Sequence, residues 1–89
     1  MAYNPHNLSV LAYANGFTLW HYTTTDTAAE TDTSGYFNAA ADMLRVGDMV
    51  LANVDTDGTP GAGIFLIAGN TSGVVDAANM TPVGAANTD

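Results

Sequence analysis

The stretch LSVLAYANGFTLWHYTT, from Leu8 to Thr24, decides the fold. Two apolar runs flank Asn15-Gly16, the dipeptide that accepts positive φ at both central positions of a type I′ turn, and this arrangement predicts a β-hairpin. A two-residue turn also sets the register of the two strands. On one face it pairs Ala14 with Phe17, Ala12 with Leu19, Val10 with His21 and Leu8 with Thr23.

Both faces of this hairpin are largely apolar, and the second face carries Tyr13, Trp20 and Tyr22. An antiparallel pair that covers a core on one side shows polar residues on the other side. Two alternatives follow. Either a helix or a second sheet of the same fold covers the aromatic face, or these three side chains contact another subunit, because Trp and Tyr are favoured interface anchors.

The chain before the hairpin, MAYNPHN, is rich in residues that favour turns and extended backbone. It predicts an extended arm over residues 1–7, in which Tyr3 and Pro5 are candidate interface residues. Residues 8–83 then form a single β-rich domain, and residues 84–89 form a loose carboxyl-terminal tail.

The segment after the hairpin contains an expected loop and an expected helix. Residues 25–34, TDTAAETDTS, show no periodicity and predict a solvated loop. Asn38 is a suitable N-cap for a short helix over AAADMLR, and Gly47 is a suitable terminator.

Three further strands are expected after this helix. They cover residues 48–54, which are apolar enough to be buried on both faces, residues 62–68, and residues 74–83, where Pro82 ends the strand or confines it to an edge. Short strands at this spacing predict an all-β fold, a mainly antiparallel small barrel or sandwich, with one short α-helix and an extended amino-terminal arm.

The composition excludes several classes of function. The 89 residues include nine Asp or Glu and one Lys or Arg, for a formal net charge of −8. Unassisted binding to nucleic acid or to an anionic membrane requires clustered cations, so neither partner is expected. Hydrophobic residues make up 47% of the chain, which indicates a folded domain, and the absence of Cys excludes disulfides and thiolate metal sites. So small a core makes oligomerisation the remaining common stabilising device.

No catalytic residue, metal site or cofactor is predicted. His21 lies in a strand, where packing is a better explanation than metal binding, and no Gly-x-Ser-x-Gly turn surrounds any serine. The stretch from Asp55 to Gly58 resembles the opening of a calcium loop, but the Gly and Glu that such a loop requires are replaced by Pro60 and Leu66. A plain turn is therefore expected there, although the acidic surface leaves adventitious calcium open.

The middle of the chain contains a distinctive series of elements: Gly35-Tyr36-Phe37, Asn38 to Met43, Leu44-Arg45-Val46-Gly47-Asp48, Met49 to Val54 and Val74-Val75-Asp76. This series resembles small virion proteins of tailed bacteriophages and gene transfer agents, of the head-decoration, cement or head-fibre type. The amino-terminal segment, from Tyr3-Asn4-Pro5 through Leu19-Trp20-His21-Tyr22, is similar to the same group.

The resemblance implies a structural role without catalytic residues. The expected function is that of a capsid decoration or cement protein on the outer surface of a phage head, made in the host bacterial cytoplasm. Its implied partners are the major capsid protein and itself, as a homotrimer. The alternative is a base or adaptor domain of a head fibre, spike or tail component, with weak glycan binding.

The positions of the acidic residues predict which surface of the protein makes these contacts. Most of them fall in residues 25–33, in the turn at residues 55–60 and at element boundaries, away from the aromatic hairpin face. We therefore expect an outward acidic surface over an uncharged, aromatic contact face, and an association between copies that strengthens as salt screens their repulsion.

Overall fold

The predicted hairpin is present in the computed structural model, which describes residues 3–14 and 16–84. Strand β1 (Leu8–Ala14) pairs antiparallel with β2 (Phe17–Thr23), and the predicted register holds from the turn to the pair Ala12 and Leu19. Gly16 has φ +76, but Asn15 lies outside the described residues, and with it the predicted turn type. Beyond Ala12 the predicted register is wrong, because Leu11 forms a β-bulge and Val10 pairs with Trp20.

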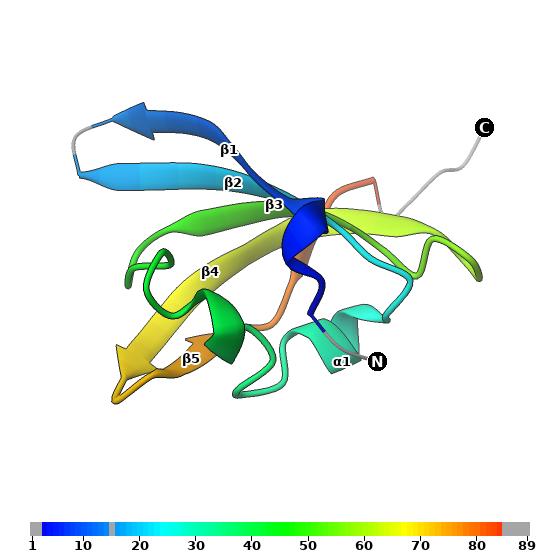
Figure 1. The fold of residues 1–89 in the computed structure, drawn as a ribbon. Coiled ribbons are helices and arrows are strands. Elements are labelled where there is room, and N and C mark those ends of the chain that lie inside the picture. The colour runs from blue at the N-terminus through cyan, green and yellow to red at the C-terminus, as the bar shows by residue number, and fades with distance from the viewer. Residues whose placement is uncertain (1–2, 15, 85–89) are drawn as a thin grey trace.

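The hairpin belongs to one six-stranded mixed sheet (Figure 1). The other strands are β3 (Met49–Val54), β4 (Gly61–Thr71), β5 (Val74–Ala77) and β6 (Thr81–Pro82). The strand order is β1-β2-β3-β4-β5, with β6 also paired to β4, and only β2 and β3 run parallel. The predicted all-β class with one short helix is confirmed. Within the described residues, however, the sheet is open, so it is neither a closed barrel nor a two-sheet sandwich.

A long crossover joins the parallel strands β2 and β3, and it contains the helix α1 (Ala28–Thr31) and the 3-10 turn η2 (Asn38–Ala40). The predicted loop at residues 25–34 is therefore partly helical. Thr27 accepts a hydrogen bond from the Glu30 backbone N–H at 3.2 Å, and the Glu30 carboxylate accepts from the Thr27 N–H at 2.9 Å. This reciprocal pair is a capping box, which starts a helix even in a short polar segment.

The helix predicted after Asn38 is wrong in type and in its cap. The segment forms a single 3-10 turn with Phe37 at the cap position, followed by turns up to Met43. The Asn38 side chain instead accepts a hydrogen bond from the Val75 backbone N–H of β5 at 2.9 Å. Gly47 does turn the chain into β3, with φ +96. Asn38 therefore fastens the crossover to the sheet.

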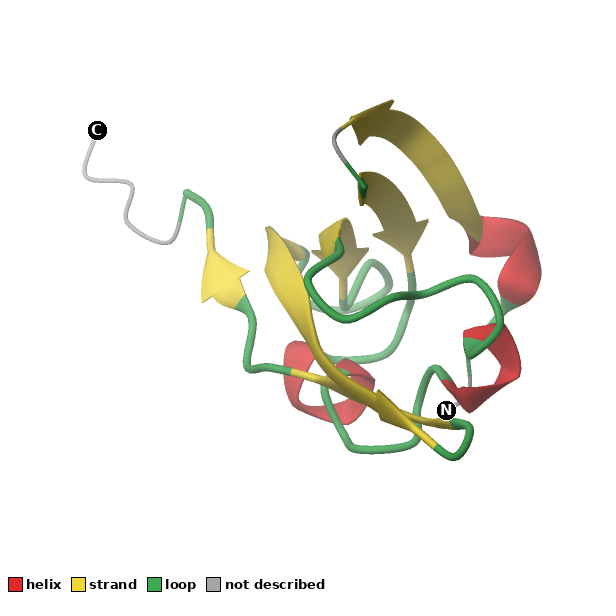
Figure 2. Cartoon of the chain, turned by 90° about the vertical axis from the view of Figure 1, so that its left-hand side faces the viewer, coloured by secondary structure: helices red, strands yellow, loops and turns green. Residues whose placement is uncertain are grey.

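The core lies between one face of the sheet and the crossover, around which the strands curve (Figure 2). Strand β3 alternates between buried and less buried positions, so the prediction that both of its faces are buried is wrong. The buried apolar side chains come from the sheet and from the crossover, and they are Trp20, Tyr22, Val50, Ala52, Val54, Phe65, Ile67, Val75 and Ala77, with Phe37, Ala40 and Leu44.

The amino-terminal segment is packed on the domain instead of extending from it as an arm. It forms the 3-10 turn η1 (Pro5–Asn7), which the Asn4 side chain caps by accepting from the His6 N–H at 3.0 Å. The Tyr3 ring stacks on Tyr22 at 5.6 Å between centroids. Residues 1–2 of the predicted arm and 85–89 of the predicted tail lie outside the described residues.

Candidate interaction surface

The five predicted interface residues do not form one surface. Trp20 and Tyr22 are buried in the core, so neither side chain is accessible to another protein. Their assignment as contacts with another subunit is therefore corrected. The alternative in which the same fold covers the aromatic face holds for these two. Tyr13 is 63% exposed near the hairpin tip, Pro5 is exposed, and Tyr3 is half-buried against the core.

Two buried carboxylates join the elements beneath the sheet. Asp48 accepts three hydrogen bonds of 3.1 Å, from the Thr18 backbone N–H, the Trp20 indole N–H and the Arg45 backbone N–H. Asp26 accepts one of 2.7 Å from the Tyr36 hydroxyl. Because a buried carboxylate is stable only when its oxygens are hydrogen-bonded, both acids serve the fold.

The Asp26 contact continues into a tyrosine cluster. The hydroxyls of Tyr36 and Tyr22 are 2.9 Å apart, and the Asn4 N–H donates to the Tyr22 hydroxyl at 3.0 Å. Burial raises the pKa of Tyr36 far above its ordinary value, and it raises the pKa of Tyr3 as well. The Tyr3 hydroxyl is buried without a hydrogen-bond partner. The cluster therefore holds the amino-terminal segment against the sheet.

The other side of the sheet, which we call the outer face, is apolar although no element of the described chain covers its centre. A more polar row of Thr23, Asn53 and Ala62 borders it, and its centre consists of side chains from β2, β3 and β4 that alternate with the core residues: Leu19, His21, Met49, Leu51, Ile64 and Leu66. The strand register sets them in two rows of three, one through Leu51 and one through Met49. A solvated sheet face is normally polar, so these rows indicate a contact surface.

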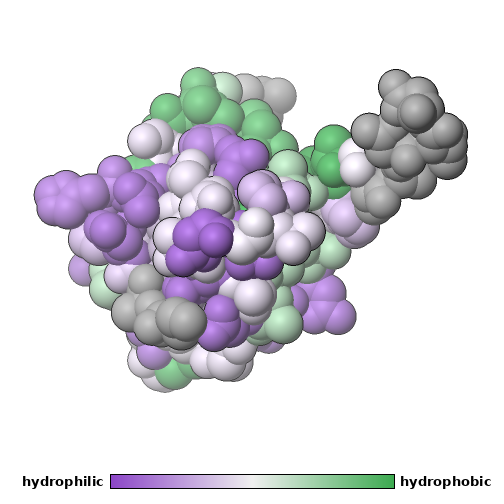
Figure 3. Space-filling model, turned by 90° about the vertical axis from the view of Figure 1, so that its right-hand side faces the viewer, coloured by the Kyte–Doolittle hydropathy of each residue, from purple (hydrophilic) through white to green (hydrophobic). Residues whose placement is uncertain are grey.

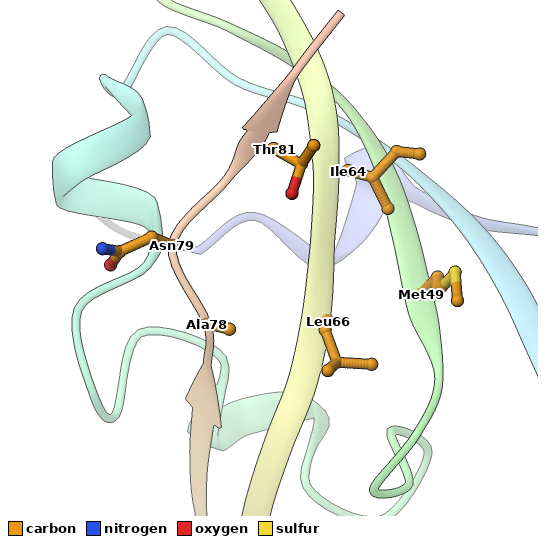
Figure 4. Close-up of a pocket in the computed structure, with 6 residues that line it drawn as sticks. All are labelled: Met49, Ile64, Leu66, Ala78, Asn79 and Thr81. Carbon is orange, nitrogen blue, oxygen red and sulfur yellow. The ribbon is translucent and has the colours of Figure 1, made fainter.

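Two hollows lie along this outer face. The first, of about 360 Å³, is lined by Met49, Ile64 and Leu66 together with Ala78, Asn79 and Thr81 from the segment that runs along β4 (Figure 4). The second, of about 260 Å³, lies beside His21, Leu51 and Val83. Hollows with apolar linings accept apolar side chains from a partner.

His21 is the titratable side chain of the outer face. Its Nε2 lies 3.0 Å from the Asn53 Oδ1, and no Ser, Asp or Glu is among the residues that line its hollow. Within residues 3–14 and 16–84, no three His, Asp or Glu side chains lie close enough together to hold a metal ion.

The stretch that resembles a calcium loop is a turn. Asp55 has φ +53, its carbonyl accepts from the Gly58 N–H at 3.0 Å, and its carboxylate accepts from the Thr59 N–H at 3.3 Å. This side chain therefore closes its own turn.

The acids lie apart from the outer face and the hairpin, although exposed apolar side chains also occur on the crossover and on β5, at Met43, Val46 and Val74. Viewed from the end opposite the hairpin tip (Figure 3), the body is mostly hydrophilic, and hydrophobic residues gather at its top, where Figure 1 places the hairpin. The acids of the described chain lie on the crossover, in the β3–β4 turn and on β5, and none lies between Tyr3 and Thr25. The outer face and the hairpin are therefore uncharged.

Sequence reasoning missed Met49, Leu51, Ile64 and Leu66 as surface residues, because apolar strands of this kind read as buried on both faces. Their exposure follows from the topology: within residues 3–14 and 16–84, the crossover covers one face of the sheet and no comparable segment lies over the other.

Comparisons with protein-family models, with curated proteins and with solved structures found no significant match to this chain. None of the helices in the described part of the chain has the length and apolar character needed to cross a membrane.

Proposed function

We propose that this protein is a non-catalytic structural protein that docks through its outer face onto a larger protein assembly, as a decoration or cement protein on the outside of a phage head. The observation that carries the proposal is the uncharged outer face, with two apolar hollows, on a chain of net charge −8. The resemblance in sequence supports a phage head as the assembly and the major capsid protein as the partner.

Docking by this face stabilises the assembly through simple linkage. A protein that binds only the assembled shell stabilises it by RT ln(1 + [L]/Kd), which is about 2.7 kcal/mol per site at a hundredfold excess over Kd. The apolar rows supply the attraction, and the acids remain in water on the crossover side.

Glycan binding in a fibre or tail component receives less support. Sugar recognition uses exposed aromatic rings, yet Trp20 and Tyr22 are buried, and among the side chains that the structure describes Tyr13 is the one aromatic ring that is more than half exposed. The fibre, spike or tail alternative therefore depends on copy number, because tens of copies or fewer per particle would favour it over decoration.

Electron cryo-microscopy of the parent particle, with add-back of purified protein to heads that lack it, tests the proposal. We expect hundreds of copies on the head exterior with Leu66 and Leu51 against the capsid. Leu66→Glu should abolish add-back, whereas the control Met43→Glu, at a side chain of similar exposure (47% against 42%) on the crossover, should retain it. Copies confined to the tail, or equal add-back by both variants, would overturn the proposal.

A further inference from the structure

The free edge of β1 is a second uncharged surface, separate from the outer face. Within the described residues, β1 pairs with β2 alone, so its other side presents unpaired backbone N–H and C=O groups. Three of its side chains are large, apolar and more than half exposed: Val10 at 57%, Leu11 at 53% and Tyr13 at 63%.

Proteins normally protect such an edge with charged side chains, Pro, a bulge or a cover. Strand β1 has no charged residue and no Pro, and the one protective feature it carries is the bulge at Leu11. The hairpin also projects from the body of the molecule (Figure 1), so the edge is open to another chain. An edge of this kind binds an added strand.

We propose that the free edge of β1 pairs antiparallel with β1 of a second copy, which joins two sheets into one across a two-fold axis. The distribution of acidic residues favours a second copy as the partner of this edge. One copy carries −8, and a second copy can approach without strong repulsion only where acids are absent, as they are from Tyr3 to Thr25. A strand that pairs with itself also satisfies the two-fold rule that each patch meets its own copy.

The size of the edge sets the strength of the pair. Seven residues span about 24 Å, and one strand edge buries well under the roughly 800 Å² per partner of a standard interface. The bulge at Leu11 interrupts regular pairing near the middle. The dimer should therefore be weak, with a Kd of about 10 µM to 1 mM, and form where local concentration is high.

The first experiment measures mass in solution by sedimentation velocity over a concentration series up to about 1 mM. We expect a reversible shift from 9.2 kDa to twice that mass. Val10→Lys, which places a cation on the edge, should raise the Kd at least tenfold. The matched control Val46→Lys, at a side chain that is 63% exposed and outside the sheet, should not.

The second experiment uses the absence of cysteine in the chain. Single cysteines at Ser9, Leu11 and Tyr13 sample the strand, and at least one should form a disulfide-linked dimer on mild oxidation, because paired strands bring Cα atoms within disulfide distance. Cysteine at Val46 should not. This readout does not depend on whether a lysine variant folds well.

Four results would overturn the proposal. The first is a chain that stays monomeric at about 1 mM, which would leave the edge to a strand of another protein. The second is a trimer. The other two are a dimer that Val10→Lys does not weaken and a dimer that Leu66→Glu, on the outer face, abolishes. The proposal is independent of a role on a phage head, since it concerns the purified chain alone.

Discussion

The indole N–H of Trp20 donates a hydrogen bond of 3.1 Å to the carboxylate of Asp48, and both side chains are buried. Trp20 belongs to β2, whereas Asp48 is the last residue before β3, 28 positions later in the chain. The same carboxylate accepts from the Thr18 backbone N–H. Asp48 therefore ties the hairpin to the end of the crossover, at the point where the parallel pairing of β2 and β3 begins.

Asp48→Asn should lower the free energy of unfolding by about 1–3 kcal/mol. An asparagine amide offers one acceptor oxygen where the carboxylate offers two, and its NH₂ group would face N–H donors that need an acceptor. Urea unfolding followed by Trp20 fluorescence measures the change. The control Asp42→Asn removes the same charge from an exposed residue and should change stability by less than about 0.5 kcal/mol. Equal stability of both variants would contradict the proposed contribution of the Asp48 hydrogen bonds to stability.

The hairpin could be predicted from the sequence because Asn15-Gly16 acts locally, but its register could not be predicted past Leu11, where a bulge intervenes. The helix α1 was readable in principle from Thr27 and Glu30, three residues apart. The parallel pairing of β2 with β3 depends on contacts across the whole crossover, for which no local pattern exists. The exposure of the outer face follows from that topology, so it could not be predicted from the sequence either.

Tyr36→Phe should destabilise the protein, whereas Tyr3→Phe should not. The first removes the hydroxyl that donates to Asp26 at 2.7 Å, and the loss of a hydrogen bond to a buried carboxylate should cost about 1–3 kcal/mol. The second removes a buried hydroxyl that has no partner, so stability should stay within about 0.5 kcal/mol or rise.

Thermal and urea unfolding of the two variants beside the wild type measure this difference. Each substitution deletes one oxygen from a tyrosine of the same aromatic cluster, so each serves as the control for the other. A Tyr3→Phe variant that loses as much stability as Tyr36→Phe would show that the Tyr3 hydroxyl has a partner after all.

Alkaline pH should lower the stability of the protein through Tyr36. Burial raises the pKa of Tyr36 above its ordinary value of 10.0, so above about pH 10 the unfolded chain releases this proton while the folded chain keeps it. The unfolded state then binds fewer protons, and the free energy of unfolding falls as pH rises. Below pH 10 the same group contributes no pH dependence.

Urea unfolding between about pH 9 and pH 11, with tyrosinate absorbance recorded in parallel, checks this expectation. The decline in stability should be shallower for Tyr36→Phe, and shallower to a smaller extent for Tyr3→Phe, since burial raises the pKa of Tyr3 as well. Tyr13→Phe, at an exposed ring, is the control and should follow the wild type. A wild type whose stability is constant over this range would contradict the expectation.

Salt should strengthen the pairing of two copies. A dimer carries twice the formal charge of −8, and its acids repel across the contact although none lies in it. The Debye length falls from about 10 Å at 0.1 M salt to about 3 Å at 1 M, so the dimer Kd should fall several-fold over that range. Asp55→Asn with Asp57→Asn removes two charges outside the contact and should flatten this dependence. If the dependence is unchanged, salting-out of apolar surface is its cause, and a Kd that rises with salt would show that an attraction between charges holds the pair.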